Sequence, residues 1–171
     1  MDQQAAGIPD PTPQLVFQTL LAIVEEVDGV APPLRQLAAI VAKNAVGSSW
    51  RKTMGSREWS RIPSQEKGQV KEAALRLLFR EPSDVIALQL GLLITNIARF
   101  DFPSEWPNLL SHLQSAVLRN GPASMRDRQR ALFTLKSVIR VLRAKRFVNE
   151  PSALAGQAGD ITITAQGTDI S

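Results

Sequence analysis

Several residue types are missing or scarce in this 171-residue chain, and each absence removes a class of function. Because there is no cysteine, disulfide frameworks, thiolate-bound zinc, iron–sulfur clusters and thiol catalysis are excluded. The single histidine, His112, cannot by itself form a multi-histidine metal site. The glycines at 47 and 55 lack the strand-to-helix context of a phosphate-binding loop. We therefore predict a protein that needs no cofactor or metal and is not an enzyme.

Long apolar runs are lacking as well. The longest, from Val85 to Ala98, is interrupted by Gln89, Thr95 and Asn96 and is shorter than the roughly 20 residues that span a bilayer. The first residues include Asp2 and no basic cluster, so they do not resemble a secretory signal. The sequence predicts an intracellular protein that is not inserted in a membrane.

Basic charge is concentrated in one segment. The whole chain carries 20 Lys and Arg against 16 Asp and Glu. Between residues 126 and 146 the only acid is Asp127, and the basic residues are Arg126, Arg128, Arg130, Lys136, Arg140, Arg143, Lys145 and Arg146. A basic helix of this kind favours an acidic partner, such as a nucleic-acid backbone, a membrane surface or an acidic protein. A solvated helix face is the equally weighted alternative.

Apolar residues recur at helical spacing in six segments that pair into three hairpins. The first helices start near residues 14, 64 and 106, and the second helices near 34, 83 and 126. In the second segment the apolar pattern is formed by Leu34, Leu37, Ile40 and Val41 among several alanines. The start-to-start spacings of about 42 to 50 residues fit HEAT or armadillo repeats. We predict an all-α superhelix of about three HEAT-like hairpins, with a compact six-helix bundle as the alternative.

The two ends of the chain lack this period. Residues 1–13 are rich in proline, and residues 148–171 are rich in Ala, Gly, Ser, Thr and Gln. Low hydrophobicity of this kind is typical of disorder. The predicted organisation is a flexible leader at 1–13, helical repeats at 14–147 and a disordered tail at 148–171.

Several motifs resemble the N-terminal region of the importin-beta family. The second segment reads Leu-Arg-Gln-Leu-Ala-Ala-Ile-Val-Ala-Lys-Asn from residue 34, followed by Trp50-Arg51. Residues 101–110 read Asp-Phe-Pro-Ser-Glu-Trp-Pro-Asn-Leu-Leu, similar to the family's Asp-x-Pro-x-x-Trp-Pro-x-Leu block. The third hairpin is most similar to the importin-eleven branch. In the Trp-Pro block we expect Trp106 to serve packing between repeats, since it offers a large apolar area.

The resemblance implies a nuclear transport receptor that moves between cytoplasm and nucleus. In such receptors the second helices of the first repeats receive the small GTPase Ran in its GTP form. Carried over by position, the Ran-binding candidates are Lys43, Asn44, Gln89, Asn96, Arg99, Arg130 and Lys136. Nucleoporins and a cargo protein would be further partners. For Asn44 and Asn96 a bond to a neighbouring backbone is as good an explanation as a partner.

Two other functions remain open at this level. The basic segment 126–146 could form a nucleic-acid-binding helix, although it lacks the Tyr or Trp side chains on which bases stack. The chain could also be a truncated structural remnant without an activity of its own, because a solenoid needs capped ends.

Overall fold

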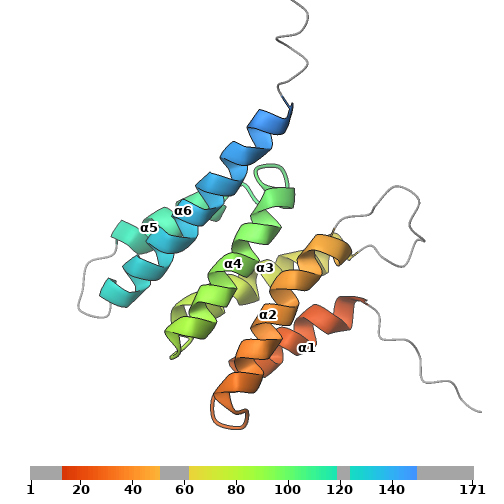
Figure 1. The fold of residues 1–171 in the computed structure, drawn as a ribbon, viewed down its shortest axis with the longest axis vertical. Helices are drawn as coiled ribbons and strands as arrows, with labels where there is room; N and C mark the ends of the chain where they lie inside the picture. Colours follow the sequence, from red (N-terminus) through yellow and green to blue (C-terminus); the bar gives the residue numbers. More distant parts are fainter. Residues whose placement is uncertain (1–12, 51–61, 119–123, 150–171) are drawn as a thin grey trace, which may run out of the picture.

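Six α-helices make up most of the described chain (Figure 1). The computed structural model describes residues 13–50, 62–118 and 124–149. The helices are α1 (Pro13–Glu25), α2 (Pro32–Ser49), α3 (Ser64–Arg80), α4 (Asp84–Asp101), α5 (Leu109–Leu118) and α6 (Ser124–Asn149). No strand occurs in these three ranges. The predicted all-α fold of paired helices is confirmed. The predicted flexible leader and disordered tail fall outside the described residues, except for Pro13, which begins α1, and residues 148 and 149, which end α6.

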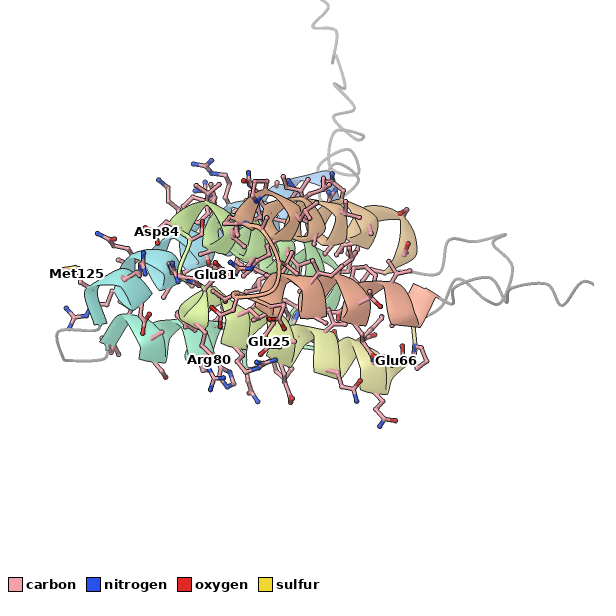
Figure 2. The ribbon with its side chains drawn as sticks, turned by 90° about the horizontal axis from the view of Figure 1, so that it is seen from below. Glu25, Glu66, Arg80, Glu81, Asp84 and Met125 are labelled. Atoms are coloured by element: carbon pink, nitrogen blue, oxygen red, sulfur yellow. The ribbon has the colours of Figure 1, made fainter. Side chains whose placement is uncertain are left out.

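The helices form two layers, as expected of stacked HEAT-like hairpins. Figure 1 shows α2, α4 and α6 side by side, and α4 packs against both of its neighbours. The view turned by 90° separates this second-helix layer from α1, α3 and α5 (Figure 2). Within the hairpins α1 contacts α2, α3 contacts α4 and α5 contacts α6. The arrangement is therefore a superhelix of stacked hairpins and not the alternative, a compact six-helix bundle. Helix α4 is its central element.

Local sequence explains most of the helix boundaries. Pro32 and Pro33 occupy the first turn of α2, where a missing N–H costs nothing. Between α3 and α4 the Glu81 carboxylate accepts a hydrogen bond from the Ser83 N–H at 2.9 Å. Two boundaries differ from the prediction. Helix α5 begins at Leu109 and not near residue 106, and Trp106 lies in the preceding turn, where it is buried. Helix α6 also continues beyond its predicted end, to Asn149.

The core is built from both layers, and α2 contributes small residues to it. Its buried apolar residues are Ala38, Ala39, Ala42 and Val46. Alanines let the backbones of α1 and α4 approach closely, and the volume is filled from the partners, for example by Phe17, whose ring meets Trp50 edge-on. The larger residues that gave α2 its predicted apolar pattern point outward: Leu34, Leu37 and Val41 are 57%, 54% and 42% exposed.

None of the helices in the described ranges is both long and apolar enough to cross a membrane.

Candidate partner-binding face

Large apolar side chains are exposed on the solvent side of the second-helix layer. Helix α4 is flanked by α2 and α6 and backed by α3, so only one side of it is open. On that side Val85 and Leu88 are 52% and 39% exposed. Helix α2 also exposes large apolar side chains, the leucines and valine described above. We call these residues, together with Asn44 and Arg99, the outer face.

Three of the predicted site residues meet at the junction of α2 and α4. The Lys43 ammonium donates to the Gln89 side-chain oxygen at 3.1 Å. The Asn96 amide donates to the Lys43 backbone carbonyl at 3.0 Å. All three are half-buried beside the outer face. Of the two explanations for Asn96, the bond to a neighbouring backbone is the one observed, so Asn96 ties α4 to α2.

The other predicted residues fall in three environments. Asn44 and Arg99 are exposed on α2 and α4, in register with the apolar residues of the outer face. Lys136 is exposed on α6. Arg130 is 8% exposed and donates to the Leu78 carbonyl at 3.0 Å, so its guanidinium braces α6 against α3.

A buried polar network holds the first two hairpins together beneath the outer face. The Trp50 indole N–H at the end of α2 donates to the Asp101 carboxylate at the end of α4, at 2.9 Å. The other Asp101 oxygen lies 2.6 Å from the Lys71 ammonium of α3, and both residues are buried. The Lys71 ammonium also donates to the Glu105 carbonyl and lies 5.6 Å from the centre of the Trp106 ring. The prediction that Trp106 serves packing is thus supported by its burial and its cation–π contact.

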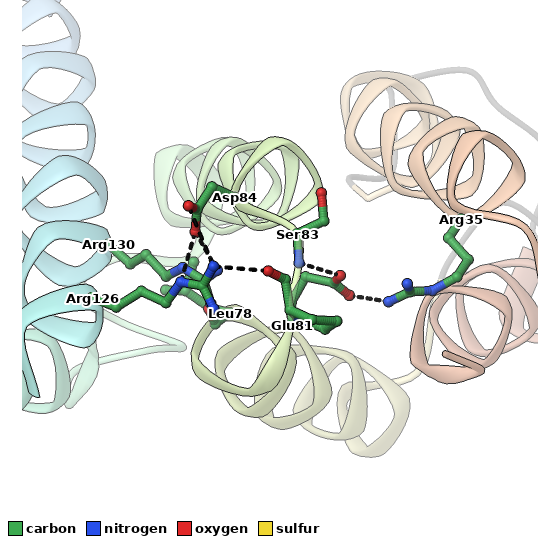
Figure 3. Close-up of polar contacts among 8 residues, drawn as sticks. Arg35, Leu78, Glu81, Ser83, Asp84, Arg126 and Arg130 are labelled. Atoms are coloured by element: carbon green, nitrogen blue, oxygen red, sulfur yellow. Dashed lines mark hydrogen bonds and ion pairs between the residues drawn. The ribbon is translucent and has the colours of Figure 1, made fainter. Parts of the chain in front are cut away.

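Two ionic clusters link successive hairpins at the other end of the layer (Figure 3). Arg35 donates to the Val24 carbonyl at 2.9 Å and forms a buried ion pair with Glu81. Across α4, Arg126 and Arg130 both pair with the Asp84 carboxylate, at 3.0 and 2.6 Å.

Ion pairs with arginine lower the pKa of two carboxyl groups, those of Asp84 and Glu25. The hydrogen bond from Arg130, followed by that from Arg126, holds the pKa of Asp84 below its usual value. In the first-helix layer, Arg76 donates to both carboxylate oxygens of Glu25 and lowers the pKa of that group in the same way. Both carboxylates are therefore ionised at neutral pH, with cationic partners from a neighbouring helix.

In the described ranges, no group of three or more His, Asp or Glu side chains could hold a metal ion. His112 is exposed, and its Nδ1 lies 2.8 Å from the Asn108 carbonyl. What the geometry provides is an apolar surface with amide and basic groups at its edges, which suits the binding of another macromolecule.

Sequence reasoning missed the apolar half of this surface. It took Leu34, Leu37 and Val41 as part of the packing pattern of α2, and proposed only polar residues as contacts. A signal was available: α2 also carries Ala38, Ala39 and Ala42, so its apolar residues extend over more than one side of the helix. An apolar surface wider than one stripe indicates that part of it faces a partner or another helix.

Comparison with known proteins gives one family and a set of partial relatives. Residues 14–80 match the family described as "Importin-beta N-terminal domain". The chain is 31% identical over 113 residues to Importin-11 of mouse and of human, which is 66% of this chain and 11% of each relative. It is 35% identical over 99 residues to Exportin-2 of Dictyostelium discoideum, 58% of this chain and 10% of that protein. The chain thus spans about a tenth of the length of these relatives. No solved structure gives a significant match.

Proposed function

We propose that this chain, whose residues 14–80 match the importin-beta N-terminal domain, is a member of the importin-beta family. In this role it would take part in nuclear transport by binding the GTP form of Ran. The proposal rests on the outer face. Apolar side chains at 39–57% exposure are costly to leave in water, and a partner that covers them gains about 25 cal/mol for each Å² of apolar area removed from water.

The proposed Ran contacts combine this apolar surface with polar groups at its edge. Leu37 and Leu88 would supply the buried centre of the interface. Asn44, Arg99 and Lys136 are the exposed polar candidates, and the Lys43–Gln89 pair lies between α2 and α4. Asn96 and Arg130 would act indirectly, by fixing the spacing of the helices, since both are engaged in contacts between helices.

The wider role follows from the relatives. They include importins and an exportin, and the greater coverage by Importin-11 favours import of a cargo protein into the nucleus. We place the protein in cytoplasm and nucleus, with nucleoporins as further partners, and we propose that it acts by binding and not by catalysis. The importin-beta-like unit would extend to residue 147, because α5 and α6 continue the two layers.

A titration of the full chain with Ran tests the proposal. Ran loaded with a non-hydrolysable GTP analogue, or with GDP, is added at two salt concentrations. We expect binding selective for the GTP form. The pair Leu37→Ser and Leu88→Ser should weaken it about ten-fold or more, as for residues at the centre of an interface. Leu118→Ser, at a leucine 68% exposed on α5 in the other layer, is the matched control and should have no effect.

The opposite result would also be clear. A monomeric, helical and cooperatively unfolding sample that fails to bind either form of Ran at about 100 µM would refute the proposal, since that concentration corresponds to only about −5.5 kcal/mol. Equal affinity for the two nucleotide forms would refute it as well.

A further inference from the structure

A pocket of about 240 Å³ lies between α4 and α6, where the second hairpin packs against the third. Its apolar lining comes from α3, α4 and α6 and consists of Leu78, Ala87, Leu88 and Phe133. Leu78 and Ala87 are buried, whereas Leu88 and Phe133 are 39% and 41% exposed. Since a cavity of about 150 Å³ holds a benzene molecule, the pocket has room for one large side chain. We call it the α4–α6 pocket.

Two arginines in the lining of this pocket share a single carboxylate. Arg126 and Arg130 both pair with Asp84, which is the only acid among the described lining residues. Residues 119–124, which precede this part of α6 in the chain, contain no Asp or Glu. The Arg130 side chain is 7% exposed and that of Asp84 is 70% exposed, so a buried cation depends on a carboxylate that lies mostly in water. The Arg130 Nε–H is also buried, and no described residue accepts a hydrogen bond from it. The described lining thus carries two cations against one anion.

The cluster between the first and second hairpins is balanced by comparison (Figure 3). Arg35 pairs there with Glu81, and the two side chains are 2% and 1% exposed. The Arg35 Nε–H donates to the Val24 carbonyl, and the Glu81 carboxylate also accepts from the Ser83 N–H. Burying a charge is costly unless a partner compensates it, and here one buried cation meets one buried carboxylate. By the same measure, the α4–α6 pocket needs one more carboxylate.

Charge and shape together define what would fit this pocket. A carboxylate neutralises the excess charge and accepts strong hydrogen bonds from guanidinium groups, whereas a Lys or Arg side chain would add to the charge. Glutamate also brings methylene groups, which can pack against Leu88 and Phe133 in the manner of a mostly apolar pocket with few polar groups. A phosphate group of about −1.5 to −2 would exceed the single excess charge and would leave these apolar side chains uncovered.

We propose that the α4–α6 pocket receives a glutamate side chain of a partner protein, whose carboxylate pairs with Arg126 and Arg130. Leu88 also belongs to the outer face, so the inference rests on the proposed function in one respect, that a partner covers this face. It does not require that partner to be Ran. A charge-complementary contact of this kind fixes the register of an interface and disfavours partners that lack the acid.

Short peptides added to the isotope-labelled full chain test the proposal by NMR. Three acetylated and amidated peptides share the sequence Ala-Leu-X-Leu-Ala, in which X is Glu, Gln or Lys. Arginine Nε–H groups give their own signals, so binding is read at Arg126 and Arg130 directly. We expect the Glu peptide to shift both signals with a Kd in the millimolar range, as is usual for a small ligand. The Gln and Lys peptides should bind about ten-fold more weakly or not at all.

Two substitutions change the charge of the lining without adding bulk, and their effects should be opposite. Asp84→Asn leaves both arginines without their carboxylate, so the Glu peptide should bind about ten-fold more tightly. Gln129→Glu, at an exposed residue that also lines the pocket, adds a second carboxylate and should weaken the Glu peptide about ten-fold. Gln114→Glu, at an exposed residue of α5, makes the same change of net charge away from the pocket and should have no effect. Damage to the fold would weaken binding in every case, so the gain in Asp84→Asn is specific to the proposal.

Three outcomes would overturn the inference. One is equal affinity for the Glu and Gln peptides, or no shift with either, because the pocket would then not select a carboxylate. Another is weaker or unchanged binding of the Glu peptide by Asp84→Asn. The third is tighter binding of inorganic phosphate than of the Glu peptide at the same arginine signals. The Ran titration is a separate measurement: if Ran binds and the Glu peptide does not, only this inference fails, and in the reverse case only the proposed function fails.

Discussion

Gly91 is the position at which the packing of the second-helix layer can be tested most directly. It lies in the middle of α4, where glycine costs about 1 kcal/mol relative to alanine. A Cβ atom at residue 91 would come within 2.7 Å of the Thr134 Oγ1 of α6. Non-bonded heavy atoms prefer about 3.5–4.0 Å, so α4 and α6 could not keep their present separation. We infer that the close approach of α6 is the reason for a glycine here.

The Gly91→Ala variant should therefore be destabilised despite its better helix propensity. Overpacking of this kind typically costs about 1–3 kcal/mol. Thr134 cannot move away easily, because it is β-branched, lies within a helix and is fully buried. Gly47→Ala is the matched control, since nothing lies within 4 Å of its added Cβ, and it should gain up to about 1 kcal/mol. In urea unfolding followed by circular dichroism, Gly91→Ala should have a lower free energy of unfolding than the wild type, and Gly47→Ala a higher one.

A double-mutant cycle identifies the contact responsible. Thr134→Ala removes the hydroxyl oxygen that clashes and should recover most of the stability lost in Gly91→Ala. Thr134→Val puts a methyl group where the oxygen was and should recover none. If Gly91→Ala is as stable as Gly47→Ala, or if Thr134→Val restores it as well as Thr134→Ala, the close approach of α6 to α4 is not what excludes a side chain at residue 91.

Three further results are expected from the polar contacts. Lys71→Met leaves Asp101 buried without its cation and should lower the free energy of unfolding by about 3–5 kcal/mol in urea titrations, whereas Arg76→Met, at a largely exposed pair, should change it by less than about 1 kcal/mol; equal losses would contradict this. Trp50→Phe deletes the N–H that donates to Asp101 and should cost about 1–3 kcal/mol, visible as a lower Tm in thermal unfolding; an unchanged Tm would argue against that bond. The folded pKa of Asp84 is lowered, so its ion pairs stabilise the protein above the unfolded value of about 3.9 and lose this effect as the pH falls through the folded pKa. Asp84→Asn should then have a lower urea midpoint than the wild type at pH 7 and the same midpoint near pH 2, and a difference that persists at pH 2 would point to a cause other than titration.

The order and extent of the helices could be predicted from the sequence because they depend on neighbouring residues. Apolar period, proline in a first turn and the break at residues 81–83 are local signals, and the six predicted helices agree with the observed ones within a few residues, except at the start of α5 and the end of α6. The family resemblance was equally accessible, because motifs such as the Trp-Pro block are written in consecutive residues.

The roles of individual side chains depended on tertiary structure. Arg35 and Arg130 look like surface residues in the sequence, yet both are buried, because Glu81 and the Leu78 carbonyl reach them from other helices. The sequence left two explanations for Asn96, and only the tertiary structure brings the Lys43 carbonyl within 3.0 Å of its side-chain amide.

The difference between local and tertiary information also explains why the exposed apolar surface could not be predicted. The sequence by itself determined that α2 is a helix with regularly spaced apolar residues, but a periodic pattern defines a face without saying what covers it. Only the packing of α1 and α4 against the alanine side decided that Leu37 and Val41 face solvent. Burial needs two surfaces in contact, and the second surface comes from a helix that is remote in the chain.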